Sequence, residues 1–349
     1  NSYFPMALYN KINGDELKAA MAASTEERLT VSFYRYAQIE DPQAFRDDLF
    51  RVWKAQGVMG RTYVASEGIN AQISVPKASW EAFAAYVDSI PFLANLRLNV
   101  AFEDDGKSFF KLKIKVRPKI VADGLDDNSF DPSAGGVHLK AADFNEMVSR
   151  DDSILIDMRN HYESEVGHFK GAVTPDVDTF RDSLPIIEDM LDEHRDKHIV
   201  MYCTGGIRCE KASAWFKHKG FENVYQLEGG IIKYAHDVEK EGLENKFIGK
   251  NFVFDERLGE RITDDIIAHC HQCGKACDTH TNCKNVTCNL LFIQCDECAA
   301  KYEGTCCSEC HDYIKLPEEE QMALRKGTDS GIRIFSKGRF PKPTPEKQS

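Results

Sequence analysis

The stretch that most constrains the fold is an apolar run followed at once by a glycine-rich turn and a helical pattern. The run His-Ile-Val-Met-Tyr at residues 198–202 is typical of a buried parallel strand. Residues 209–220 have helical spacing, with the apolar side chains Ala212, Ala214, Trp215 and Phe216. Strands that alternate with helices in this way build α/β sheets, so the stretch predicts a sheet of that class.

The turn between strand and helix consists of Cys203, Thr204, Gly205, Gly206, Ile207 and Arg208. Its cysteine would face backbone N–H groups and the positive end of a helix dipole, which favours thiolate over thiol. The glycines let the backbone curl around the sulfur, and Arg208 adds a fixed positive charge that can hold an oxyanion. The alternative is a small buried cysteine at a strand end. Because all these features coincide, we interpret Cys203 as a reactive thiol.

Length and composition set the broad class. A chain of 349 residues suggests two or three domains, and 42% hydrophobic residues suffice to give each a core. The net charge of −12 argues against a general nucleic-acid coat but leaves room for a local basic groove. We find no signal peptide and no membrane-spanning run, so the twelve cysteines are interpreted as metal ligands or reactive thiols in a reducing compartment, with the cytoplasm as the expected location.

Residues 1–120 are predicted to form a first domain. Strand-like and helix-like segments follow in the order strand, helix, strand, strand, helix, strand, which is typical of a ferredoxin-like α+β fold. The strand-like segments are residues 29–36, 62–65 and 69–75 and, after the second helix, the two segments 95–102 and 109–120; the first helix is residues 42–56.

The last of these strands carries cations on one face. Its alternation places apolar residues on one side and Lys111, Lys113, Lys115, Arg117 and Lys119 on the other. Lysines that protect an edge strand from aggregation are the alternative explanation. Protection needs only one or two charges, so we predict that the cations contact phosphates, with RNA as the partner. No sequence specificity follows from such a strip.

Residues 121–250 are predicted to form a second domain. Residues 123–136 have a linker composition, and strands then alternate with helices as far as residue 227. This pattern predicts a doubly wound α/β sheet, in which ligands bind beyond the carboxyl ends of the strands. Both Asp157 and Cys203 lie at such ends.

Four stretches of this domain together resemble a rhodanese domain. They are Asp-Met-Arg-Asn-His-Tyr-Glu at 157–163, Gly-His-Phe-Lys-Gly-Ala at 167–172, the loop at 203–208 and Leu-Glu-Gly-Gly-Ile at 227–231. In rhodaneses the loop cysteine carries a persulfide, so the resemblance implies that Cys203 is the nucleophile. It also implies that Asp157, Arg159 and Glu163 support the loop. Related cysteine phosphatases have a longer loop, sized for phosphate, which makes a phosphatase the weaker interpretation.

A wider resemblance extends over nearly the whole chain. It rests on residues 60–70, 113–117, 209–211 and 252–257 and on the cysteine-rich end. These stretches are similar to the rhodanese-related tRNA uridine hydroxylases, the TrhO family. The resemblance implies that tRNA is the partner, dioxygen is a co-substrate, and the wobble uridine becomes 5-hydroxyuridine.

Hydroxylation usually needs flavin, haem or iron. The sequence has no Gly-x-Gly-x-x-Gly turn, and we expect neither flavin nor haem. His161 and Glu163 have the spacing of part of an iron triad, but the rhodanese pattern already uses Glu163. Our hypothesis is that the Cys203 thiolate adds to the uracil ring and makes an enolate that reacts with dioxygen, while Arg208 and the loop amides hold the negative oxygen.

Two other classes compete with this hypothesis. A sulfurtransferase would use Cys203 to pass persulfide sulfur to a small acceptor or to RNA. A non-enzymatic rhodanese module would be expected to lack the cysteine. The two enzymes differ in what they require, dioxygen for one and a sulfur donor for the other. A thiol reductant or a sulfur donor is the further partner, and the electron source stays open. The sequence does not identify the substrate tRNAs, a role for Cys209 or the oligomeric state.

Residues 251–349 form a cysteine-rich end with a basic tail. Ten of the twelve cysteines lie between Cys270 and Cys310, and a segment so short and polar is typical of a metal-stabilised module. The predicted ligands of two structural zinc ions are Cys270, Cys273, Cys283, Cys288, Cys295, Cys298, Cys307 and Cys310. Their pairing stays open, either first pair with third and second with fourth or nested neighbours. Cys277, His280 and Cys306 are spare. Disulfides are the alternative, which the compartment disfavours.

Overall fold

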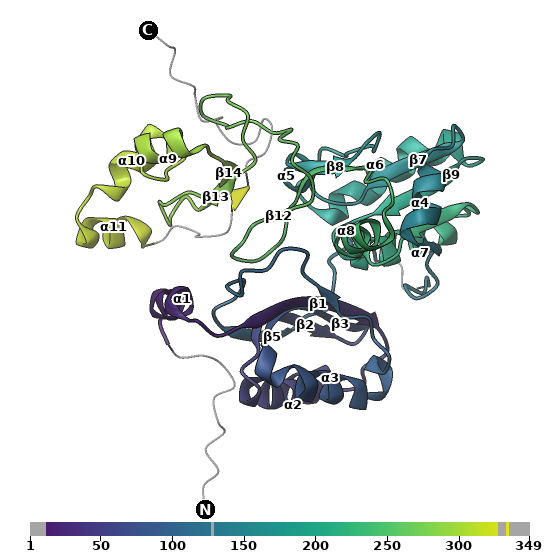
Figure 1. Ribbon diagram of the computed structural model, residues 1–349, viewed down its shortest axis with the longest axis horizontal. Coiled ribbons are helices and arrows are strands. Elements are labelled where there is room, and N and C mark those ends of the chain that lie inside the picture. Colours follow the sequence, from purple (N-terminus) through teal and green to yellow (C-terminus); the bar gives the residue numbers. More distant parts are fainter. Residues whose placement is uncertain (1–11, 127–128, 327–332, 335–349) are drawn as a thin grey trace, which may run out of the picture. The chain divides into compact units, whose positions relative to one another are not determined.

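The computed structural model describes residues 12–126, 129–326 and 333–334. The chain divides into two compact units, and Figure 1 labels most of their helices and strands. The first unit comprises Asn1–Met158, Phe180–Asn245 and Phe254–Arg257. The second comprises Arg159–Thr179, Lys246–Val253 and Leu258–Ser349. The predicted ferredoxin-like domain and the loop of Cys203 therefore belong to the same unit.

The N-terminal part of the first unit is a sheet in the order β4-β1-β3-β2-β5. Its first four positions have the strand order of a ferredoxin-like fold, which confirms the predicted class. The strands are β1 (Arg28–Tyr36), β2 (Met59–Ala65), β3 (Gly68–Pro76), β4 (Asn99–Val100) and β5 (Leu112–Val116). The helices are α1 (Gly14–Ala23), α2 (Pro42–Ala55) and α3 (Trp80–Ser89).

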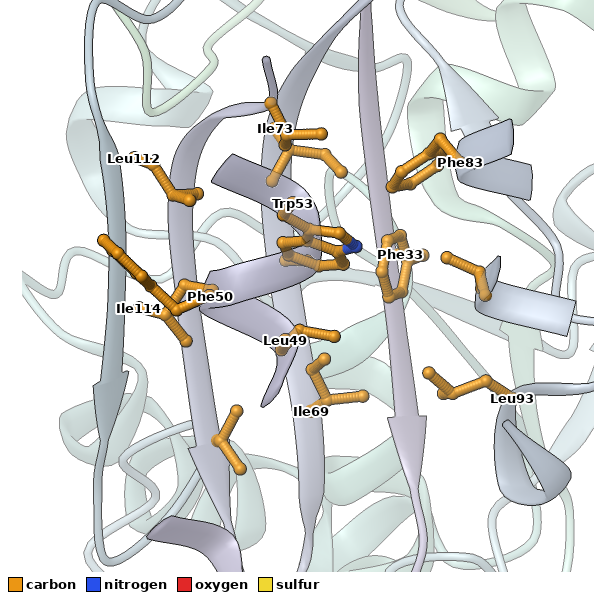
Figure 2. Close-up of a cluster of buried hydrophobic side chains, with 14 of the residues drawn as sticks. Phe33, Leu49, Phe50, Trp53, Ile69, Ile73, Phe83, Leu93, Leu112 and Ile114 are labelled. Atoms are coloured by element: carbon orange, nitrogen blue, oxygen red, sulfur yellow. The ribbon is translucent and has the colours of Figure 1, made fainter. Parts of the chain in front are cut away.

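Helices α2 and α3 cover one face of this sheet, as Figures 1 and 2 show. Helix α2 begins with Pro42 after Asp41, whose carboxylate accepts the Ala44 N–H at 2.9 Å. The helix then buries Trp53 fully, with its ring centroid 6.2 Å from Phe33 of β1 and 5.8 Å from Phe83 of α3. The buried apolar side chains of the sheet point to this face. The other face therefore carries polar and aromatic side chains.

The predicted basic strand is shorter than expected. The segment predicted as residues 109–120 forms strand β5 only over Leu112–Val116, where it pairs in parallel with β2. Leu112 and Ile114 are buried as the alternation predicts, whereas Val116 is 37% exposed because it lies at the free end. The segment predicted at 95–102 pairs only over Asn99–Val100, because residues 95–98 leave the strand for a loop.

The second sheet of this unit is parallel, in the order β6-β10-β9-β7, and it confirms the doubly wound class. Helix α4 packs against α8, and α6 packs against α7. The strands are β6 (Val137–Leu139), β7 (Ser153–Asp157), β9 (His198–Tyr202) and β10 (Val224–Leu227). The helices are α4 (Ala141–Val148), α6 (Phe180–Leu191), α7 (Ile207–His218) and α8 (Gly230–Glu241).

The second unit holds smaller elements. It contains α5 (His161–Ser164), β8 (Gly167–Phe169), β11 (Phe247–Asn251), β12 (Glu260–Arg261), β13 (His280–Asn282), β14 (Leu290–Ile293) and β15 (Arg333–Ile334). Helices α9 (Asp296–Lys301), α10 (Ser308–Ile314) and α11 (Glu318–Arg325) follow the cysteine-rich segment. The basic tail of the prediction lies outside the described residues, apart from residues 333–334. Within the described ranges, no helix has the length and apolar character needed to cross a membrane.

Candidate active site and metal centres

Cys203 lies directly after β9, and the backbone of the following turn holds its sulfur. The N–H of Gly206 donates to Cys203 Sγ at 3.1 Å, and Gly206 has a φ of 105°, which suits glycine. Helix α7 begins at Ile207, so the sulfur lies beside the amino end of a helix. The turn therefore places the cysteine where the sequence predicts it.

The neighbours of Cys203 favour its ionised form. Its side chain is fully buried, which by itself raises the pKa, but a hydrogen bond from the Cys209 thiol, the charge of Arg208 and backbone N–H groups lower the pKa to about 6. The pKa of Cys209 is raised well above its ordinary value by burial and by the neighbouring Cys203. Cys209 thus stays protonated, and its S–H group donates a hydrogen bond to the Cys203 thiolate, a role that the sequence left open.

A second glycine turn, at residues 229–230, packs against the backbone of the Cys203 loop. Gly230, which begins α8, has a φ of 67°, and a Cβ there would lie 2.5 Å from the Thr204 carbonyl oxygen and 2.6 Å from that of Cys203. The N–H of Ile231 donates to the Cys203 carbonyl at 3.0 Å. This close approach requires glycine at position 230, and a φ of 72° favours glycine at position 229 as well.

Arg208 lies at the loop's exit. Its Nη2 is 3.5 Å from Thr204 Oγ1, and its guanidinium is 6.0 Å from the ring centroid of Phe254. The carbonyl of Phe254 accepts a hydrogen bond from Arg61 of β2 at 2.8 Å. Phe254 therefore connects the loop arginine to the ferredoxin-like sheet.

The predicted supporting residues fall in both units. In the first unit Asp157 Oδ2 accepts the Tyr202 hydroxyl at 2.7 Å and is fully buried beside the end of β9. In the second unit Arg159 Nη2 donates to the Gly167 carbonyl at 2.7 Å. Glu163 accepts the Asn160 N–H at 2.9 Å in the capping box of α5. Arg159 and Glu163 thus hold backbone of the second unit, whereas Asp157 holds a side chain of the first.

Helix α7 contributes a buried lysine that sequence reasoning did not single out. Lys211 Nζ lies 2.8 Å from Asp123 Oδ2 and 3.0 Å from Glu67 Oε1, and Lys211 is 1% exposed. Glu67, in the β2–β3 turn, also accepts the Ile120 N–H at 2.7 Å. The sequence signal that could have identified Lys211 is the stretch 209–211, which is part of the resemblance to the hydroxylase family. Asp123 is equally buried, so the predicted linker starts as a packed structural segment.

The basic face of the ferredoxin-like sheet differs from the prediction at its end. Lys119 Nζ binds the buried Asp123 carboxylate at 2.6 Å, which takes it away from the other cations. The register places Arg61 opposite Lys113 and Tyr63 opposite Lys115. We define the basic face as Lys111, Lys113, Lys115, Arg117 and Arg61. Burial and its cationic neighbours lower the pKa of Lys113, which indicates a concentrated positive field.

In the described part of the cysteine-rich segment, sulfur atoms gather into two groups. One contains Cys270, Cys273, Cys295 and Cys298, and the other contains Cys283, Cys288, Cys306 and Cys310. The first cysteine pair thus joins the third and the second joins the fourth, the former of the two open alternatives. The second group uses Cys306 where we predicted Cys307, because Cys306 faces the cluster, with its sulfur 3.7 Å from those of Cys288 and Cys310.

The spacing of these sulfurs tests their fit to a metal. Four ligands about 2.3 Å from a tetrahedral zinc ion lie roughly 3.8 Å from one another. Cys273 and Cys295 are 3.6 Å apart, and Cys288 and Cys306 are 3.7 Å apart. Further donors face the sulfurs, the Cys295 N–H to Cys270 and the Asn285 amide to Cys310. Both groups therefore fit a tetrahedral metal ion held by thiolates.

Comparison with known proteins covers nearly the whole chain. Residues 28–120 match the model of a UPF0176 acylphosphatase-like domain, residues 140–237 a rhodanese-like domain, and residues 248–311 a rhodanese C-terminal segment. A structure of a rhodanese-like domain from Anabaena is 17% identical and covers 32% of this chain and 78% of its own, with a TM-score of 0.26.

Curated relatives match at much higher identity. A tRNA uridine(34) hydroxylase of Pectobacterium carotovorum is 60% identical over 333 residues, which cover 95% of this chain and 94% of the relative. One of Yersinia pestis is 57% identical over 349 residues, which cover 98% of both chains. Identity at this level over almost the full length is shared by members of one family, and this chain therefore belongs to the tRNA uridine(34) hydroxylase family.

Proposed function

We propose that this protein hydroxylates the wobble uridine of tRNA to 5-hydroxyuridine, with dioxygen as co-substrate and Cys203 as the active-site thiolate. The observation that carries the proposal is the pairing of a family match over nearly the whole chain with a buried Cys203 whose pKa is about 6. A thiolate at neutral pH is the nucleophile that addition to a pyrimidine ring requires.

The reaction starts with a bond between Cys203 Sγ and the ring carbon next to the carbon that is hydroxylated. The electron pair of the ring double bond moves to the carbonyl oxygen and forms an enolate, which Arg208 and the loop N–H groups stabilise. The enolate carbon binds dioxygen and, with a proton, becomes a hydroperoxide. Two thiols of an external reductant cleave the peroxide bond, which leaves the alcohol, a disulfide and water. Loss of the ring proton then expels the Cys203 thiolate and restores the double bond.

The tRNA would lie along the polar face of the ferredoxin-like sheet. Residues paired directly across its strands share one face, and the register gives the row Tyr34, Asn70, Tyr63 and Lys115 from β1 to β5. Tyr34 touches the catalytic loop, since a Cβ on Gly206 would lie 2.9 Å from its hydroxyl. The row therefore joins the loop to the basic face, where phosphates would bind.

The two cysteine groups would each hold a structural zinc ion. All four ligands in each group are cysteines, which favours zinc and leaves no open position for chemistry. The ions would stabilise a segment that has few other sources of a core.

The test is nucleoside mass spectrometry of tRNA incubated with the purified protein under isotopically labelled dioxygen and a thiol reductant. We expect label in uridine with the wild type and with Cys307→Ser, which changes a cysteine outside both metal groups. We expect none with Cys203→Ala. Full labelling by Cys203→Ala would refute the proposed mechanism. Sulfur incorporation that needs a persulfide donor, with no label, would instead identify a sulfurtransferase.

A further inference from the structure

A pocket of about 390 Å³ opens beside the catalytic loop within the first unit. Its walls come from β1, from residues 95–99 and from the rhodanese-like part of the unit. The residues that matter for its chemistry are Tyr34, Arg97, Asn99, His138, Gly205 and Glu210. Cys203 is not among the lining residues, so the pocket adjoins the reacting sulfur without containing it.

One wall is the edge of a strand. Strand β4 pairs with β1 only at Val31 and Ser32, and among the described residues no strand continues along that edge from Phe33 to Tyr36. Such an edge presents a row of backbone N–H and C=O groups. These groups suit the hydrogen-bonding edge of a nucleobase, because they offer both donors and acceptors.

A second wall is the half-buried ring of Tyr34. Its hydroxyl donates to Glu210 Oε2 at 3.1 Å, and the same carboxylate receives the Gln226 amide at 3.1 Å and lies 3.0 Å from His138 Nε2. The hydrogen bond to Glu210 raises the pKa of His138, although burial opposes this effect. The carboxylate thus fixes Tyr34 in place between the loop and the pocket.

The third wall supplies a positive charge. Arg97 Nη2 pairs with Glu228 Oε1 at 2.8 Å, and its side chain remains 45% exposed. Its Nη1 lies 3.2 Å from where a Cβ of Gly229 would be, next to the Gly230 that supports the loop. Arg97 is therefore anchored at one end and available to a phosphate at the pocket rim.

We infer that this pocket binds one nucleotide of the substrate RNA, the one immediately next to the modified uridine. The inference rests on the proposed function. An aromatic ring, a strand edge and an arginine match the base, its polar edge and its phosphate. The volume is at the lower end of the range for small-molecule sites, which suits a single nucleotide. A flanking nucleotide fits because the pocket reaches Gly205 while the sulfur of Cys203 lies outside it.

Photo-crosslinking of full-length protein tests the inference directly. Anticodon stem-loop RNAs would each carry one 4-thiouridine, either at the wobble position or on one side of it, and crosslinked peptides would be mapped. We expect a flanking position to crosslink to the peptide that contains Tyr34 or Arg97. If neither flanking position reaches these peptides, or if the wobble position alone does, the inference is wrong.

Variants give a second readout that does not depend on the crosslink. Tyr34→Ala and Arg97→Ala should each weaken binding of the stem-loop about tenfold and raise KM with little change in kcat. Tyr34→Phe keeps the ring and should bind nearly as the wild type. Arg51→Ala, an exposed arginine on α2, serves as the charge-matched control. Unchanged binding by both Tyr34→Ala and Arg97→Ala, with thermal unfolding also unchanged, would overturn the inference.

These outcomes separate the inference from the proposed function. If labelled oxygen enters uridine but neither the crosslinks nor the pocket variants show RNA at the pocket, the inference is wrong and the proposed function stands. Crosslinks to Tyr34 without any labelled product would remove the function and leave the pocket as an RNA site.

Discussion

The Lys211 ammonium group lies 2.8 Å from the Asp123 carboxylate, and both side chains are buried. This ion pair joins α7, which follows the loop of Cys203, to the segment that leaves the ferredoxin-like domain. Lys211→Met should lower the free energy of unfolding by about 3–5 kcal/mol, because it leaves a buried carboxylate with less compensation. Lys217→Met, on the same helix but exposed, should change it by less than about 0.5 kcal/mol. Denaturant unfolding measures the free energy of unfolding of both variants. Equal losses in the two would contradict a stabilising ion pair between Lys211 and Asp123.

Asp123 also predicts a pH dependence of stability. Burial raises its pKa, but hydrogen bonds from Lys119 and Lys211 outweigh burial and hold the pKa below the ordinary value of 3.8. The contribution of the carboxylate is therefore complete above about pH 4 and is lost as pH falls through the lower pKa of the folded state. The stability gap between the wild type and Asp123→Asn should shrink below about pH 4. A gap that stays constant down to acid unfolding would count against this assignment.

Cys203 should titrate with a midpoint near its pKa of about 6. The ultraviolet difference spectrum between the wild type and Cys203→Ser reports this thiolate separately from the metal-binding cysteines. Hydroxylation should fall below the same midpoint, because the nucleophile becomes protonated. Arg208→Gln should raise the midpoint, since the neighbouring positive charge is gone, while Arg195→Gln, an exposed arginine, should not. A midpoint near 9 in the wild type would refute the thiolate.

Gly230 should be intolerant of a side chain. Gly230→Ala places a Cβ 2.5 Å from the Thr204 carbonyl oxygen, so the catalytic loop must shift. Gly242→Ala is the matched control, because Gly242 has a similar φ of 65° with nothing within 4 Å of the Cβ position. The control should cost about 1–2 kcal/mol for the left-handed backbone. Gly230→Ala should cost about 1–3 kcal/mol more and should also reduce hydroxylation. Equal activity in the two variants would argue against the contact.

Substitutions of two adjacent cysteines test whether Cys306 or Cys307 belongs to the second metal group. On the proposal of one zinc ion in each group, Cys306→Ser should lower the zinc content from two ions per chain towards one, because its sulfur belongs to the second group. Cys307→Ser should keep both ions. Elemental analysis of purified protein measures this directly, and loss of an ion in Cys307→Ser alone would reverse the assignment.

The basic face should control the salt dependence of tRNA binding. Lys113→Gln should reduce the slope of log affinity against log salt by about 1, because each phosphate that a protein cation neutralises adds roughly that much to the slope. Lys119→Gln should leave that slope unchanged and lower stability instead, since Lys119 pairs with Asp123. Identical slopes for wild type and Lys113→Gln would exclude binding of a phosphate by Lys113.

The sequence predicted those features that depend on neighbours along the chain. Period-two alternation located the core face of β5, and the strand, turn and helix around Cys203 followed from local pattern and glycine chemistry. Paired cysteines predicted two metal groups, because ligands three to five residues apart reach the same ion. Motif resemblance predicted the family, which the relatives confirm.

The tertiary structure decided what depends on contacts between distant segments. The backbone conformation before α10 decides that Cys306 and not Cys307 faces the cluster. Two adjacent cysteines in a sequence do not show which of them points to the other ligands. Lys119 is not part of the basic face, because it forms an ion pair with the buried Asp123. Tyr34, Glu210 and Lys211 gain their roles from the packing of the ferredoxin-like domain on α7. Alternation and spacing specify a local face, whereas the partner of that face is fixed only when the whole chain has folded.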